Sequence, residues 1–184
     1  MTKKILVACE YSGVVREAFA KKGWDAWSCD LLPTDQLSDK HIQGDCLEAI
    51  ASQKWNMIIA HPPCTFLTVS NSKNWKKLQE NGKQQAAIKF VEDIYDSDCP
   101  RICIENPVGA LTNHSKLGKA TQYVQPYEFG HGEQKRTGFW LKGLPKKERH
   151  RLHWLPPSKD RWKIRSTTFP GIAEAMADQW GGLV

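Results

Sequence analysis

Short apolar runs alternate with helix-length segments along most of the sequence. The first run is Lys4-Ile5-Leu6-Val7-Ala8-Cys9, and after Gly13 apolar residues recur at helical spacing over 14–20. Further strand-like runs lie at 26–29, 41–43, 57–60, 101–104, 122–125 and 137–141, and helical patterns lie at 46–50, 84–95 and 172–177. Strands separated by helix-length segments are typical of parallel βαβ units. The sequence therefore predicts an α/β fold with a doubly wound, mostly parallel sheet.

The length of the chain, 184 residues, is that of one domain, which would bury about 70% of the surface of the unfolded chain. We therefore expect a single domain over 1–184. No stretch approaches the roughly 20 apolar residues of a membrane helix, and the start Met1-Thr2-Lys3-Lys4 leads into a strand pattern rather than a signal peptide. These features predict a cytoplasmic protein.

The turn Pro62-Pro63-Cys64 directly follows the apolar run 57–60. Proline fixes its own φ and restricts the residue before it, so this turn should present the thiol to a cleft. A second run, 101–104, leads into Glu105-Asn106-Pro107. Open α/β sheets bind ligands at the carboxyl ends of their parallel strands. We therefore predict that the Cys64 nucleophile and the Glu105 carboxylate share one site.

The other cysteines are Cys9, Cys29, Cys46, Cys99 and Cys103. The chain has no Cys-x-x-Cys pair, and most of its thiols fall in apolar runs, unlike a disulfide framework or a zinc site. We expect these five to be small buried hydrophobic residues. His61 and His131 flank the predicted cleft in sequence, as turn residues or substrate contacts rather than metal ligands. No metal is predicted.

Positive charge is concentrated late in the chain. Residues 1–50 hold six Lys and Arg against eight Asp and Glu, whereas residues 131–170 hold eleven against three. A solvated face would explain the charge alone, but Arg161, Lys163 and Arg165 are interleaved with tryptophans, and aromatic rings stack on unpaired bases. Clean periodicity is also absent from 65–83 and 143–170. We interpret the first as an active-site loop and the second as a basic, nucleic-acid-facing loop.

Several motifs resemble those of a known family, in the same chain order. The strings Ile58–Cys64, Ile104–Pro107 and Gln134-Lys135-Arg136 resemble the Pro-Cys, Glu-Asn and Gln-x-Arg motifs of the cytosine-5 DNA methyltransferases. Upstream, Glu10-Tyr11-Ser12-Gly13 matches that family's cofactor loop, and Asp30 and Asp45 match its two cofactor-site acids. The similarity covers nearly the whole chain. It implies a Rossmann-like, S-adenosylmethionine-dependent methyltransferase fold.

The resemblance also implies a binding site for S-adenosylmethionine. Its residues would be Glu10, Ser12 and Gly13 near the methionine part, Asp30 at the ribose hydroxyls, Asp45 at the adenine amino group, and Pro62. An acid after the second strand of such a fold accepts hydrogen bonds from ribose. Helix capping or turn formation explains an aspartate at either position equally well when each is taken alone.

The implied reaction begins with addition of Cys64 to carbon 6 of cytosine, while Glu105 supports ring nitrogen 3. Carbon 5 then takes the methyl group and loses its proton, and the thiol leaves. Arg136 would steady the pyrimidine oxygen or a phosphate, and Gln134 would brace the site. In a duplex the base must first be flipped out, at a cost of a few kcal/mol.

Three departures from the family pattern leave the substrate open. The cofactor loop has one glycine instead of two, and Gly138 stands where a second arginine is usual, so Lys135 or Arg165 would rebuild base contacts. Only 137–171 is available where a target-recognition domain usually lies. DNA is the leading substrate. The alternative substrates are RNA and a free cytosine nucleotide, and the alternative function is a binding module without turnover. Specificity would come from the basic loop, a protein partner or a homo-oligomer.

Overall fold

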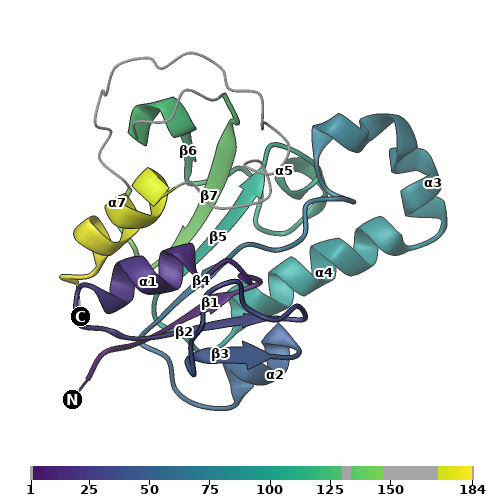
Figure 1. The fold of residues 1–184 in the computed structure, drawn as a ribbon. Helices are drawn as coiled ribbons and strands as arrows, with labels where there is room; N and C mark the ends of the chain where they lie inside the picture. Colours follow the sequence, from purple (N-terminus) through teal and green to yellow (C-terminus); the bar gives the residue numbers. More distant parts are fainter. Residues whose placement is uncertain (1, 130–133, 147–169, 184) are drawn as a thin grey trace.

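The computed structural model describes residues 2–129, 134–146 and 170–183, and in this part the strands form one twisted sheet (Figure 1). The strands are β1 (Lys4–Ala8), β2 (Asp25–Asp30), β3 (His41–Gln43), β4 (Met57–Ala60), β5 (Ile102–Pro107), β6 (Gln122–Val124) and β7 (Thr137–Lys142). Their order is β3-β2-β1-β4-β5-β7-β6. The first five are parallel, and β7 runs antiparallel between β5 and β6. The predicted α/β, Rossmann-like, mostly parallel sheet is confirmed.

Helices cover both faces of the sheet, as expected for a doubly wound fold. The described helices are α1 (Val14–Ala20), α2 (Cys46–Ala51), α3 (Trp75–Glu80), α4 (Lys83–Asp96), α5 (Leu111–His114) and α7 (Pro170–Trp180), with 3-10 helices η1 (Val69–Asn74) and η2 (Pro126–Phe129). One core joins α1 and α7 to the sheet, and the other joins α2 and α4 to its opposite face. None of the described helices is long and apolar enough to cross a membrane.

The central strands are apolar throughout because both of their faces are buried. In β1, Ile5 and Val7 belong to the core beneath α1 and α7, whereas Leu6 and Ala8 belong to the core beneath α2 and α4. Successive side chains of a strand point to opposite faces, so a strand between two helical layers needs apolar residues at every position. This explains the continuous apolar runs that mark β1 and β4.

Two local expectations were wrong. The segment 65–83, taken to be irregular, contains η1 and α3. Leu78 is the only buried residue of α3 and η1 has none, so neither short helix shows an apolar stripe in the sequence. In addition, Glu105 does not follow β5 but lies within it, because β7 pairs with β5 as far as Pro107. That pairing joins residues 30 to 40 positions apart, and no local pattern reveals it.

Candidate active site

The carboxyl ends of β1 to β4 meet at one edge of the sheet. In the sheet, β2 and β3 lie on one side of β1, and β4 and β5 lie on its other side. The strand order therefore reverses between β1 and β4. Open α/β sheets bind ligands at such a switch point. The residues that follow these strands, from Cys9 after β1 to Cys64 after β4, therefore surround the expected position of a ligand.

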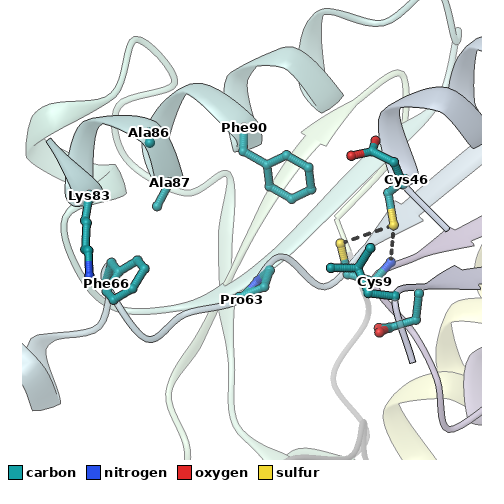
Figure 2. A pocket seen from close by; sticks show the side chains of 11 residues that line it. Cys9, Cys46, Pro63, Phe66, Lys83, Ala86, Ala87 and Phe90 are labelled. Atoms are coloured by element: carbon teal, nitrogen blue, oxygen red, sulfur yellow. Dashed lines mark hydrogen bonds between the residues drawn. The ribbon is translucent and has the colours of Figure 1, made fainter. Parts of the chain in front are cut away.

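A cavity of about 390 Å³ lies at this edge, between the ends of β1 to β4 and the first half of α4 (Figure 2). Its volume is within the range of small-molecule and cofactor sites. The residues that line it are Cys9, Asp30, Leu31, Asp45, Cys46, Pro63, Phe66, Lys83, Ala86, Ala87 and Phe90. Most of these side chains are apolar, and two carboxylates stand at one end.

The two predicted cofactor-site acids both line this cavity, and each also holds nearby backbone. Asp30 Oδ1 accepts a hydrogen bond from the N–H of Leu32 at 3.0 Å. Asp45 Oδ1 accepts one from Leu47 N at 2.7 Å, as the N-cap of α2. Asp45 therefore acts as a helix cap, the role considered above as an alternative to cofactor binding. Because the same side chain borders the cavity, capping and ligand contact are compatible at this position.

The aromatic wall of the cavity was missed in the sequence. Phe66 follows the Pro-Pro-Cys turn, and Lys83 lies with its Nζ 5.9 Å from the centroid of the Phe66 ring. Figure 2 shows Phe90 projecting from α4 toward the same space. Lys83, Ala87 and Phe90 follow the i, i+4, i+7 spacing of one helix face. Helical spacing over 84–95 predicts the helix, but it does not distinguish a face that lines a cavity from a face that packs in the core.

Two thiols meet at the end of the cavity near β1. Sγ of Cys9 and Sγ of Cys46 are 3.7 Å apart, and Cys46 Sγ also accepts a hydrogen bond from Cys9 N at 3.2 Å (Figure 2). Hydrogen-bond contacts with Cys29 and Cys9 lower the pKa of the Cys46 thiol. Cys29, Cys46, Cys99 and Cys103 are buried as expected, but Cys9 is half-buried and lines the cavity.

The loop predicted to bind the methionine part is occupied by contacts within the protein. The buried Glu10 carboxylate accepts hydrogen bonds from Val15 N at 2.7 Å and Arg16 N at 3.2 Å, which fixes the start of α1. Gly13 has φ of 70°, and a Cβ there would lie 2.6 Å from Arg16 Nη2. Glu10, Ser12, Gly13 and Pro62 are not among the described residues that line the cavity. Pro63 lines the cavity, where Pro62 was expected. The carbonyl of Pro62 instead accepts a hydrogen bond from Asn106 Nδ2 at 2.9 Å.

Next to the cavity, Cys64 and Glu105 form one electrostatic cluster with Lys135. Burial raises the pKa of the Cys64 thiol, the Lys135 charge acts in the opposite direction, and the Glu105 carboxylate adds to the rise. For Glu105, burial alone would raise the pKa, but a hydrogen bond from His61, the Lys135 charge and a hydrogen bond with Thr137 outweigh it and leave the pKa lowered. The structure thus brings the predicted nucleophile and carboxylate together, with a lysine beside both.

The remaining predicted residues are placed differently. The guanidinium of Arg136 lies 4.4 Å from the centroid of the Tyr123 ring of β6, and both Arg136 and Gln134 are exposed. Successive residues of an extended chain point to opposite sides, so Lys135, not Arg136, faces the cluster. Most of the predicted basic loop, 147–169 with Arg165, lies outside the described residues. The same holds for His131.

The turn that carries Cys64 is tied to the segment after β5. Cys64 O accepts hydrogen bonds from Leu67 N and Thr68 N at 2.9 Å, and Leu67 O accepts from Ala110 N at 2.7 Å. A Cβ on Gly109 would lie 1.9 Å from Leu67 O. The absence of a side chain at Gly109 therefore lets the two segments approach.

Substituting Gly109 with alanine is expected to force these segments apart. Overpacking of this kind costs roughly 1–3 kcal/mol of the free energy of unfolding. Urea unfolding followed by far-UV circular dichroism would measure the loss. The matched control is Gly182→Ala, where no atom lies within 4 Å of the added Cβ and a change below about 0.5 kcal/mol is expected. Equal midpoints for both variants would contradict this account of Gly109.

Comparisons with known proteins find a solved structure that aligns with the chain but no matching family. No protein-family model matches the chain, and no curated protein sequence matches it. Among solved structures, a protein described as a DNA modification methyltransferase encoded within a prophage (E. coli) aligns with a TM-score of 0.48 at 15% sequence identity. The alignment covers 76% of this chain and 46% of the other, so the chain spans about half of that protein's length. The function must therefore be argued from the residues of this chain.

Proposed function

We propose that this protein methylates carbon 5 of cytosine, in DNA, with S-adenosylmethionine as methyl donor and Cys64 as covalent nucleophile. The observation that carries the proposal is the juxtaposition of Cys64, Glu105 and Lys135 beside a cofactor-sized cavity at the switch point of the sheet. A thiol, a carboxylate and a cation in one cluster are the groups needed to add to a pyrimidine ring and balance its charge.

The cavity fits the adenosine part of the proposed donor. Its apolar wall, with Phe66 and Phe90, suits the faces of a purine, and the carboxylates of Asp30 and Asp45 suit donors such as ribose hydroxyls and an amino group. When bound, the group supplies an electrophilic methyl. Asp30, Asp45, Pro63, Phe66 and Phe90 would hold it, while Glu10 would act by fixing the start of α1.

Cys64 would react as a thiolate, although burial raises the pKa of its thiol. Lys135 opposes that rise, so its charge favours the reactive form. The thiolate forms a bond to carbon 6, and the electrons of the 5,6 double bond move toward carbon 5 and nitrogen 3. After methylation, a water molecule takes the proton from carbon 5, which restores the double bond and expels Cys64 as thiolate, and the proton on nitrogen 3 returns to solvent.

Glu105 would balance the charge at nitrogen 3. Since the pKa of Glu105 is lowered, the group is a carboxylate at neutral pH in the free protein. Two acceptors, the carboxylate and nitrogen 3, cannot face each other without a proton between them. One proton therefore enters from solvent with the base, is shared between Glu105 and nitrogen 3, and resides on nitrogen 3 once the thiolate has added.

The substrate would be distinguished by comparing duplex DNA, single-stranded DNA, RNA and cytosine nucleotides as methyl acceptors. DNA is expected to react best, with rates that fall steeply as salt increases, because phosphate contacts release counterions. Methylation of a free nucleotide alone, without salt sensitivity, would instead favour the small-molecule alternative.

Binding of the donor gives a test that does not need turnover. Asp30→Asn keeps an oxygen for the Leu32 N–H but removes the charge, so affinity for S-adenosylmethionine should fall roughly ten- to a hundred-fold by isothermal titration calorimetry. Asp25→Asn, at the opposite end of β2, is the matched control and should bind like wild type. Equal affinities for wild type and both variants would remove Asp30 from the proposed site.

A further inference from the structure

His61 is a largely buried histidine to which the reaction described above gives no role. It directly follows β4, and its backbone N–H donates to Ala8 O at 3.0 Å, which fixes its position at the edge of the sheet. Its Nδ1 lies 3.2 Å from Oε2 of Glu105. The two side chains are only 10% and 16% exposed, so this contact is largely shielded from water.

Charged and titratable groups face this histidine from several elements. Glu105 approaches from β5, and Glu10 approaches from the loop after β1. Burial raises the pKa of the Glu10 carboxyl, and His61 acts against that rise. Lys135, which precedes β7, acts on Glu105, and Cys64 lies on the same turn as His61. Glu10 is already fixed by the N–H groups at the start of α1. The imidazole thus stands between one carboxylate that is fixed and one that must meet the substrate.

We propose that His61 is a positioning residue for Glu105, holding Oε2 by its Nδ1–H so that the carboxyl group meets the pyrimidine in one fixed orientation. This inference rests on the proposed function, because that function identifies the ligand of Glu105 as a pyrimidine. Its geometric basis is independent of that function: a contact of hydrogen-bond length between two largely buried side chains, each anchored in a neighbouring parallel strand or its turn.

A fixed orientation matters because a carboxyl group must offer the ring one particular oxygen. Terminal torsions of glutamate are broad, so an unrestrained carboxyl samples many angles. A hydrogen bond to a charged group is stronger than one between neutral groups, so it selects one of them. The same bond lowers the pKa of Glu105 against the effect of burial. His61 therefore controls both the direction and the protonation of the group that faces nitrogen 3.

The first test measures Glu105 directly and needs no turnover. In protein labelled with ¹³C at glutamate carboxyls, the Glu105 resonance is identified by its loss in Glu105→Gln. It is expected to titrate at higher pH in His61→Ala than in wild type, because burial remains and the hydrogen bond is gone. His61→Gln, which keeps an N–H donor, should lie between them. A Glu105 titration that is the same in His61→Ala and wild type would overturn the proposal.

The second test measures methyl transfer by the same variants. His61→Ala should lower kcat roughly ten- to a hundred-fold with KM within a few-fold, and His61→Gln should recover most of the loss. The matched control, His114→Ala on the exposed face of α5, should keep wild-type kcat. Equal impairment of the alanine and glutamine variants, or wild-type kcat in His61→Ala, would refute positioning. If wild type itself methylates nothing, the proposed function fails, while the carboxyl titration still decides the link between His61 and Glu105.

Discussion

Replacing Cys64 with alanine is expected to abolish methyl transfer, lowering the rate by roughly four orders of magnitude or more. The loss should be this large because no other described thiol lies in the cluster with Glu105 and Lys135, so nothing replaces the bond to carbon 6. Affinity for S-adenosylmethionine should stay within about two-fold of wild type, since Cys64 does not line the cavity. Single-turnover transfer of a labelled methyl group would measure the rate.

The matched control for this loss is Cys99→Ser. Cys99 is buried in the segment before β5, away from the cluster. Its Sγ lies 3.4 Å from Trp55 O and 3.3 Å from Arg101 O, contacts that a hydroxyl can keep. Its activity should equal that of wild type. A binding module without turnover makes the opposite prediction: wild type and Cys64→Ala would bind nucleic acid equally, and neither would transfer a methyl group.

Replacing Glu105 with glutamine should lower the rate roughly a hundred- to a thousand-fold while leaving Cys64 in place. The amide can donate a hydrogen bond to nitrogen 3 but cannot transfer a proton to it, so negative charge on the ring is balanced less well. Glu174→Gln, exposed on α7, is the matched control and should have no effect on the rate. A Glu105→Gln variant with the wild-type rate would mean that another group supports the ring.

The same substitution should also remove a pH-dependent contribution that Glu105 makes to the stability of wild type. The pKa of Glu105 is lowered in the folded state, so its carboxylate contributes stability that is fully present above the ordinary glutamate pKa, about 4.3. That contribution is lost as pH falls through the lower, folded-state pKa. The difference in unfolding free energy between wild type and Glu105→Gln should therefore be larger at pH 7 than in acid. Urea unfolding at the two pH values would measure it.

The sequence was most informative where the fold dictates local composition. Strands buried on both faces need continuous apolar runs, so β1 and β4 were recognisable. Parallel strands bring their carboxyl ends to one edge, so the convergence of Cys64 and Glu105 followed from the order of the runs. The positions of Asp30 and Asp45 at the cavity follow from the same rule.

Contacts between distant segments could not be predicted in this way. The extension of β5 through Glu105 depends on β7, and Lys135 reaches the cluster only because that strand pairs antiparallel to β5. The hydrogen bond between His61 and Glu105 joins residues 44 positions apart. Phe90 lines the cavity because α4 crosses that edge of the sheet, and its helical spacing alone does not distinguish a cavity wall from a core.

The most direct test of the proposed chemistry is mass spectrometry of nucleosides from DNA incubated with S-adenosylmethionine labelled in its methyl group. Wild type should yield labelled 5-methyl-2′-deoxycytidine, and Cys64→Ala should yield none. The absence of 5-methylcytosine from DNA, RNA and cytosine nucleotides treated with wild type, or equal yields from wild type and Cys64→Ala, would contradict covalent catalysis by Cys64.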